Sequence, residues 1–111
     1  MNIQVQQCGA VSVVHPDGPL TGEAATQLKE QLQDQIKEHM GRIVLDTTDI
    51  PYLDSGGLEI LVELTEQLSQ SGQALKLCNP NPTFKEVLEL TGISSLFEIY
   101  EDSHTATRSF L

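Results

Sequence analysis

The sequence predicts a single α/β domain in which about four helices pack on a mixed, mainly parallel sheet of about five strands. Short apolar segments alternate with longer amphipathic ones along the chain, and such alternation is typical of parallel strands joined by helices. The length of 111 residues is that of one ordinary domain, so we expect one domain over residues 1–111. Apolar residues make up 39% of the chain and charged residues 20%, as in a globular protein.

The first part of the chain is predicted to form two strands and a helix. Residues 3–5 alternate apolar and polar side chains, which indicates a strand with one face in solvent, and residues 10–15 form the next strand. From Glu23 to His39 apolar residues recur every three or four positions, and Gly41 is suited to ending a helix. We therefore predict an amphipathic helix with a narrow buried stripe of Ala25, Leu28, Leu32 and Ile36.

A central strand and a broad helix are predicted next. Residues 43–46, IVLD, contain three consecutive apolar residues, as a strand buried on both faces does. The helix is predicted from Leu58 to about Ser71, before Gly72. At 100° per residue its apolar side chains cover more than half of its circumference. Its exposed face is acidic, with Glu59, Glu63 and Glu66.

The last part of the chain is predicted to form a strand, a helix, a strand and a short final helix. The strands are residues 74–78 and 96–100, and the final helix lies within residues 102–111. Thr83 and Glu86 have capping-box spacing, so we expect the helix between the strands to begin at Thr83.

Composition excludes several classes of function. Sixteen acidic against six basic residues give a formal charge of −10, which argues against nucleic acid and anionic lipid as partners and favours a basic protein surface. No segment is long and apolar enough to enter a membrane, and the N-terminus has no secretory signal, so we expect a cytoplasmic protein. The two cysteines are expected to be free thiols, although a disulfide stays open. Neither Cys nor His has metal-ligand spacing, so we expect no metal site and no cofactor.

The stretch YLDSGGLE, residues 52–59, places a serine before two glycines at a predicted helix start. Two interpretations of Ser55 are open. It can be the N-cap, which accepts a hydrogen bond from the first turn and contributes about 1 kcal/mol. Alternatively, Gly56 and Gly57 leave the first turn without side chains, so that another molecule can reach the Ser55 hydroxyl. The electropositive helix start then favours a phosphate on Ser55.

Catalytic interpretations of this region are not supported. DSGG is not the nucleophile-elbow pattern, and no spacing links Ser55 to His15, His39 or His104 as a base. Asp46 ends the central strand, as the phosphate acceptor of a response-regulator receiver does. The acidic pair and the lysine that a receiver needs on its first and last strands are missing from residues 3–5 and 96–100.

The segment IVLDTTDIPYLDSGGLEIL resembles the signature of the STAS domain, and in particular of the bacterial anti-sigma factor antagonists. Members have an apolar strand ending in Asp, a short loop, and Asp-Ser-x-Gly-Leu at a helix start, which Asp54, Ser55, Gly57 and Leu58 match. GPLTGEAATQL and the segment from residue 74 to 102 resemble other parts of the family, so the resemblance extends along the whole chain.

The resemblance implies a non-enzymatic binding switch. In that family an anti-sigma factor that is also a serine kinase phosphorylates the serine matching Ser55, and a serine phosphatase removes the phosphate. The unphosphorylated protein sequesters the anti-sigma factor. The implied contact residues are Asp54, Ser55, Gly56, Gly57, Glu59 and Thr21. The alternative is a STAS docking subunit, without phosphorylation, of a membrane lipid-transport or other signalling complex.

Overall fold

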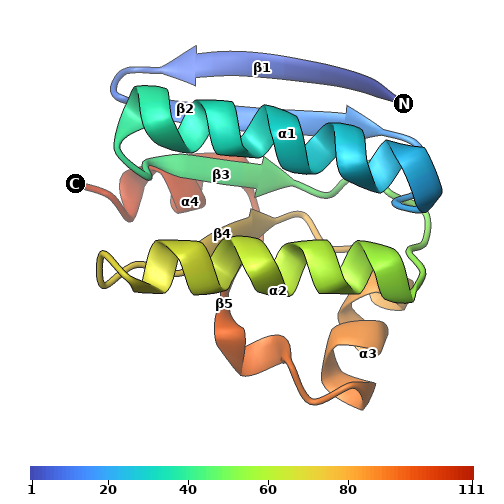
Figure 1. Ribbon diagram of the computed structural model, residues 1–111. Coiled ribbons are helices and arrows are strands. Elements are labelled where there is room, and N and C mark those ends of the chain that lie inside the picture. The colour runs from blue at the N-terminus through green and yellow to red at the C-terminus, as the bar shows by residue number, and fades with distance from the viewer.

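A five-stranded mixed sheet forms the centre of the computed structural model, which describes residues 1–111 (Figure 1). The strands lie side by side in chain order. β1 is antiparallel to β2 and the other neighbours are parallel, which confirms the predicted mixed, mainly parallel sheet. The strands are β1 (Asn2–Cys8), β2 (Val11–Asp17), β3 (Ile43–Asp46), β4 (Leu75–Cys78) and β5 (Phe97–Tyr100).

Four α-helices accompany the sheet, as predicted. They are α1 (Gly22–His39), α2 (Ser55–Ser69), α3 (Pro82–Leu90) and α4 (Ser103–Arg108), with a 3₁₀ turn η1 (Ser94–Leu96) before β5. Connections between parallel strands are right-handed, and the strand order follows the chain. For these two reasons α1, α2 and α3 fall on one face of the sheet. α4 packs on the opposite face, behind the strands in Figure 1.

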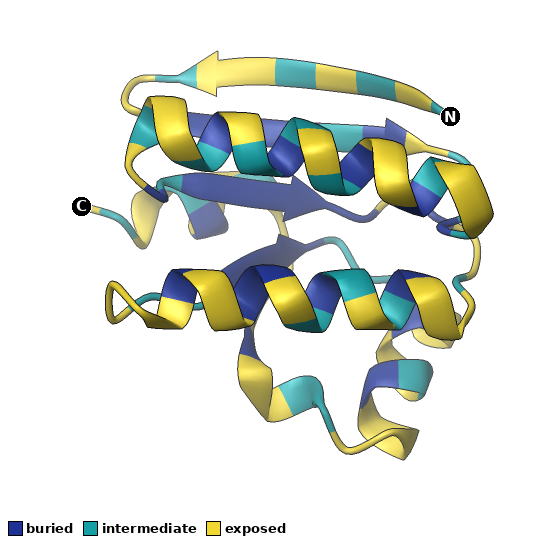
Figure 2. Ribbon diagram, viewed as in Figure 1, coloured by how far each residue is buried: buried dark blue, intermediate teal, exposed yellow.

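The larger core lies between the sheet and the three connecting helices, and Figure 2 shows its buried residues on β3, β4 and the inner sides of α1 and α2. The stripe predicted for α1 is confirmed, with Ile36 half-buried and the other three residues buried. Gln35 is also buried, because its Oε1 accepts a 2.6 Å hydrogen bond from Ser12 Oγ of β2. The apolar arc of α2 is narrower than predicted, since its half-buried residues include Leu58, Ile60 and Val62.

The smaller core lies between α4 and the other face of the sheet, and it contains a buried lysine. Lys76 of β4 is only 8% exposed. Its Nζ donates a 2.6 Å hydrogen bond to Ser109 Oγ and lies 4.1 Å from the ring centroid of Phe110. Glu98 Oε1 is 3.5 Å from the same nitrogen. The charge is therefore compensated by an ion pair, a hydrogen bond and an aromatic face, and it holds the C-terminal residues on the sheet.

Two predicted helix starts are wrong. α2 begins at Ser55 and not at Leu58. α3 begins at Pro82, because the side chain of Asn81 accepts a 2.8 Å hydrogen bond from Phe84 N–H and caps the helix, so Thr83 lies inside it. The capping-box spacing of Thr83 and Glu86 pointed two residues too far along the chain. A proline is well placed at the first position of a helix, where its missing N–H costs nothing.

The two cysteines are free, as expected, and their thiols differ in environment. Burial raises the pKa of the Cys78 thiol to about 12, and the carboxylates of Asp46 and Asp102 add to the increase. At pH 8 a thiol with that pKa is ionised in about one molecule in 10⁴.

We therefore expect a thiol reagent such as DTNB at pH 8 to titrate one cysteine, the half-buried Cys8, in the native protein and both in denaturant. The Cys8→Ser variant should then be unreactive until it unfolds, and rapid native labelling of Cys78 would contradict this assignment.

Candidate functional site

The first turn of α2 is capped by Asp54 and not by Ser55. Asp54 has extended backbone angles, and its Oδ1 accepts a 2.8 Å hydrogen bond from Gly57 N–H. Its carbonyl oxygen accepts a second bond, of 3.0 Å, from Leu58 N–H. The N-cap interpretation of Ser55 is therefore wrong. Ser55 is the first helical residue, it is exposed, and its hydroxyl has no part in the cap.

Gly57 allows a second loop to reach the helix start. A Cβ atom at this position would lie 2.3 Å from the carbonyl oxygen of Leu20 and 3.1 Å from its Cγ. No side chain fits there without a shift of the Leu20 backbone. Gly56 differs, because a Cβ there would meet only Asp54 Oδ1, at 3.3 Å. The two glycines therefore have separate roles. Gly57 is required by packing, and Gly56 leaves the surface beside Ser55 uncovered.

The loop before α1 and the loop before α2 are joined by backbone hydrogen bonds. Gly18 N–H donates to Asp49 O and Leu20 N–H donates to Tyr52 O, each over 3.0 Å. Residues 18–21 and 49–54 therefore form one platform, which we call the switch platform. Thr21, at the N-cap of α1, is half-buried and belongs to it. Thr21 follows Leu20, whose carbonyl oxygen accepts a 3.4 Å hydrogen bond from Asp54 N–H and approaches Gly57, so the structure places Thr21 close to the start of α2.

A histidine that the sequence left unassigned holds the platform to the sheet. His15 Nε2 lies 2.7 Å from Asp49 Oδ2, and His15 Nδ1 lies 3.4 Å from Asp46 Oδ2. Asp46 Oδ1 accepts hydrogen bonds from Thr48 and from Asn79 Nδ2. These contacts join the carboxyl ends of β2, β3 and β4. The imidazole pairs with these two carboxylates and not with the Ser55 hydroxyl.

The two chain segments that contain the platform have acidic residues and no lysine or arginine. Residues 16–28 and 43–75 contain no lysine or arginine, whereas five exposed acidic residues lie on or beside the platform: Asp17, Glu23, Asp49, Asp54 and Glu59. Glu59 lies four residues after Ser55 on the exposed side of α2. The acidic face predicted for this helix is less uniform than expected, because Glu63 accepts a 2.6 Å hydrogen bond from Lys29 Nζ of α1. No three His, Cys, Asp or Glu side chains gather as metal ligands.

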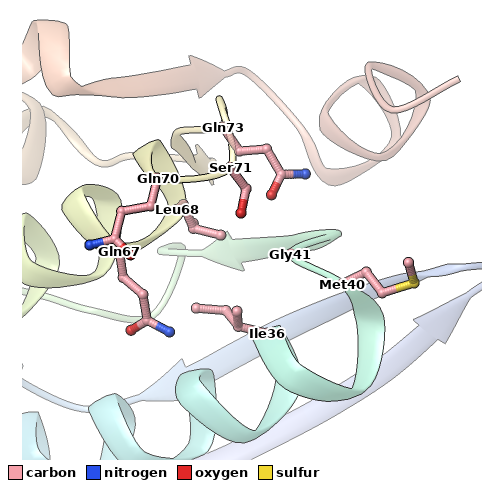
Figure 3. Close-up of a pocket in the computed structure, with 8 residues that line it drawn as sticks. All are labelled: Ile36, Met40, Gly41, Gln67, Leu68, Gln70, Ser71 and Gln73. Carbon is pink, nitrogen blue, oxygen red and sulfur yellow. The ribbon is translucent and has the colours of Figure 1, made fainter.

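A cleft of about 480 Å³ lies at the other end of α2, between the C-terminal ends of α1 and α2. Figure 3 shows that Gln67, Gln70 and Gln73 line it, together with Ile36 and Met40. No ionisable side chain is present, so this cleft offers no general acid or base and no strong metal ligand. The 15 residues of α2 separate it from Ser55 by about 20 Å, so it is not part of the platform.

Comparison with known proteins identifies the family. A model of the STAS domain matches residues 2–106. The chain belongs to the STAS domain family. The resemblance inferred from residues 43–61 is therefore confirmed over almost the whole sequence, and the arrangement of one mixed sheet with four helices is the STAS fold.

Several relatives of this STAS domain have a described role. It is 31% identical over 83 residues to the anti-sigma-B factor antagonist of Listeria monocytogenes, covering 74% of this chain and 72% of that protein. It is 22% identical over 107 residues to the anti-sigma F factor antagonist of Paenibacillus polymyxa, covering 96% and 92%. The structure of the anti-sigma factor antagonist SpoIIAA of Bacillus, in its unphosphorylated form, matches with a TM-score of 0.78 at 18% identity, over 98% of this chain and 96% of that one.

The same fold also occurs inside transporters. The murine anion transporter Slc26a9 matches with a TM-score of 0.76 at 15% identity, over 95% of this chain and 18% of that chain. In this STAS domain itself, none of the helices has the length and apolar character needed to cross a membrane.

We predict that the two glycines of the α2 start differ in their tolerance of alanine. Gly57→Ala should lower the free energy of unfolding by about 1–3 kcal/mol, because the new methyl group overlaps the Leu20 carbonyl. Gly56→Ala should leave stability unchanged or raise it by up to about 1 kcal/mol, because alanine is the better helix former. Urea unfolding of both variants measures the difference, and equal stabilities would show that the contact with Leu20 is unimportant.

We also predict that Asp54 and not Ser55 stabilises the helix start. Asp54→Ala should lower the free energy of unfolding by about 1 kcal/mol. Asp54→Asn should recover most of this loss, because asparagine can also accept the hydrogen bond from Gly57 N–H. Ser55→Ala should change stability by less than about 0.5 kcal/mol. If Ser55→Ala instead lowered the free energy of unfolding by about 1 kcal/mol, the serine would be the N-cap.

Proposed function

We propose that this STAS domain is an anti-sigma factor antagonist that is controlled by phosphorylation of Ser55. The observation that carries the proposal is the division of roles at the α2 start. Asp54 makes the cap, so the exposed Ser55 hydroxyl is free on a turn that Gly56 and Gly57 leave without side chains. The described roles of the Listeria and Paenibacillus relatives support the same function.

In this proposal the domain is a binding protein and not an enzyme. Unphosphorylated, it sequesters an anti-sigma factor that has serine kinase activity and so releases the sigma factor in the cytoplasm. The kinase phosphorylates Ser55, and a serine phosphatase resets the switch. The absence of lysine and arginine from residues 43–75 favours a partner with a basic contact surface. The contact residues are Asp54, Ser55, Gly56, Gly57, Glu59 and Thr21.

Electrostatic repulsion alone can supply the difference in binding free energy that the proposed switch needs. A phosphate adds about −1.5 to −2 charges. One unit of that charge, about 7 Å from one anionic group at an effective dielectric constant of about 20, costs about 2.4 kcal/mol. Such a group is present in the partner if the nucleotide stays bound after phosphoryl transfer. The full phosphate therefore costs about 4 kcal/mol, of which the α2 start offsets about 1 kcal/mol. The net 2–3 kcal/mol is about two powers of ten in affinity.

The phosphate need not disturb the fold. The hydroxyl of Ser55 is outside the cap, and the first buried leucine of α2, Leu61, lies almost two turns further along the helix. The Asp54 cap and the contact between Gly57 and Leu20 therefore remain in place when Ser55 is modified. The competing effect is repulsion between the phosphate and Asp54, which acts on the two glycines of the first turn.

A second candidate function is a STAS docking subunit of a membrane-transport complex, in which Ser55 is not phosphorylated. The match to a domain of an anion transporter is the observation that favours it. Neighbouring genes discriminate between the two functions. A gene for a histidine-kinase-like ATPase favours the switch, whereas genes for transporter subunits favour docking.

We expect Ser55 to be the only residue that the partner kinase phosphorylates. The protein is incubated with ATP and the anti-sigma factor kinase encoded nearest to its gene, and phosphorylated sites are mapped by mass spectrometry. Ser55→Ala is the variant that should remain unmodified, and Ser103→Ala, at the start of α4 on the opposite face of the sheet, is the matched control that should be modified normally. Phosphate on Ser55→Ala, or none on the native protein, would overturn the proposal.

We further expect phosphorylation to weaken partner binding by about two powers of ten without unfolding α2. Calorimetry measures the affinity, and amide hydrogen exchange of both forms measures protection along the helix. Protection from Leu61 to Leu68 should be unchanged, because these residues belong to the main core. Loss of protection there would mean that the phosphate acts by melting the helix.

A further inference from the structure

β1 is a long, regular edge strand that nothing covers. Its seven residues, Asn2–Cys8, pair one to one with β2 from Asn2–Asp17 to Cys8–Val11, so the strand contains no bulge. Its other side has no neighbour in the sheet, and Figure 1 shows no helix or loop beyond it. An open edge of this kind presents unpaired N–H and C=O groups to any other strand, and natural proteins usually protect it with charges, proline, bulges or a covering element.

β1 has no acidic or basic side chains. Residues 1–16 contain none of the 16 acidic and six basic residues, although the formal charge of the protein is −10. The other edge strand, β5, is the contrasting case. It is four residues long, contains Glu98 and is followed by Glu101 and Asp102. One edge of the sheet is therefore protected in the usual way, and the other is long and uncharged.

The two faces of β1 are also suited to pairing. Ile3 and Val5 are half-buried and pack against the main core. Gln4 and Gln6 are exposed on the opposite face, where amide side chains of adjacent strands can hydrogen-bond to each other.

We propose that β1 is the interface at which two copies of this chain pair, as antiparallel strands related by a twofold axis at Val5. This register uses all seven residues, places Val5 against its symmetry mate, and sets Gln4 of each copy opposite Gln6 of the other. A second copy is the occupant because an antiparallel edge is self-complementary. Repulsion between two acidic molecules is also smallest where they meet through their uncharged residues. The result is a continuous ten-stranded sheet.

The pairing leaves the switch platform accessible. α2 packs over β4, and β2 and β3 lie between β4 and β1 in the sheet. Both copies of Ser55 therefore stay exposed. The proposal does not depend on what binds there.

Sedimentation equilibrium of the native protein tests the proposal. Between about 10 µM and about 1 mM the mean mass should rise from the 12.2 kDa of one chain toward twice that value. Gln4→Lys with Gln6→Lys should weaken association by roughly tenfold or more, because like charges would face each other across the axis. Gln67→Lys with Gln70→Lys adds the same charge on exposed positions at the C-terminal end of α2, and this variant should still dimerise.

Amide hydrogen exchange of the native protein gives an independent readout that needs no variant. Every second N–H of β1 points away from β2 and is open in the monomer. These amides should gain protection as the concentration rises, and those of β5 should not. A protein that stays monomeric at about 1 mM, or that dimerises without protecting β1 or with the edge-lysine variant unaffected, overturns the proposal. Monomers at that concentration would leave the edge to an extended segment of another protein.

Discussion

The close approach of the Leu20 backbone to Gly57 is the contact on which the functional end of this STAS domain depends. β2 and β3 are parallel neighbours, so the loops that follow them leave the sheet at the same end and run beside each other. Backbone hydrogen bonds join these loops, and the missing side chain of Gly57 lets the start of α2 close on them. The position of Ser55 therefore follows from the order of two strands and the size of one residue.

At the α2 start, the residue that caps the helix and the residue with the free hydroxyl are different. Asp54 supplies the hydrogen bond that the first turn needs, so the neighbouring hydroxyl has no structural duty. A group can be added to Ser55 or removed without breaking a bond of the native state, as a reversible switch requires. The contacts of His15 with Asp46 and Asp49 hold the loop of residues 49–54 on the sheet. They therefore keep the exposed Ser55, which follows this loop, on a defined surface.

Charge is distributed unevenly over the molecule, and each region has its own physical role. The two segments that contain the platform have acidic residues and no lysine or arginine, and under the proposed function this charge favours a basic partner. The β1–β2 hairpin has almost no ionisable groups before Asp17, so it offers backbone and amide contacts instead. Lys76 is buried on the second face of the sheet, where Glu98, Ser109 and Phe110 compensate its charge and hold the chain end in place.

The sequence by itself determined what depends on near neighbours. Apolar patterning located the strands and the two long helices, because a buried stripe needs a fixed local spacing, and the stretch from Asp54 to Leu58 pointed to the family. Tertiary structure decided which side chain met which. Asp54 and Ser55 are both good caps, and only the backbone angles at residue 54 gave the cap to the aspartate. The pairing of His15 with Asp49 spans 34 residues, and no local pattern encodes such a distance, since it arises only when the parallel strands are assembled.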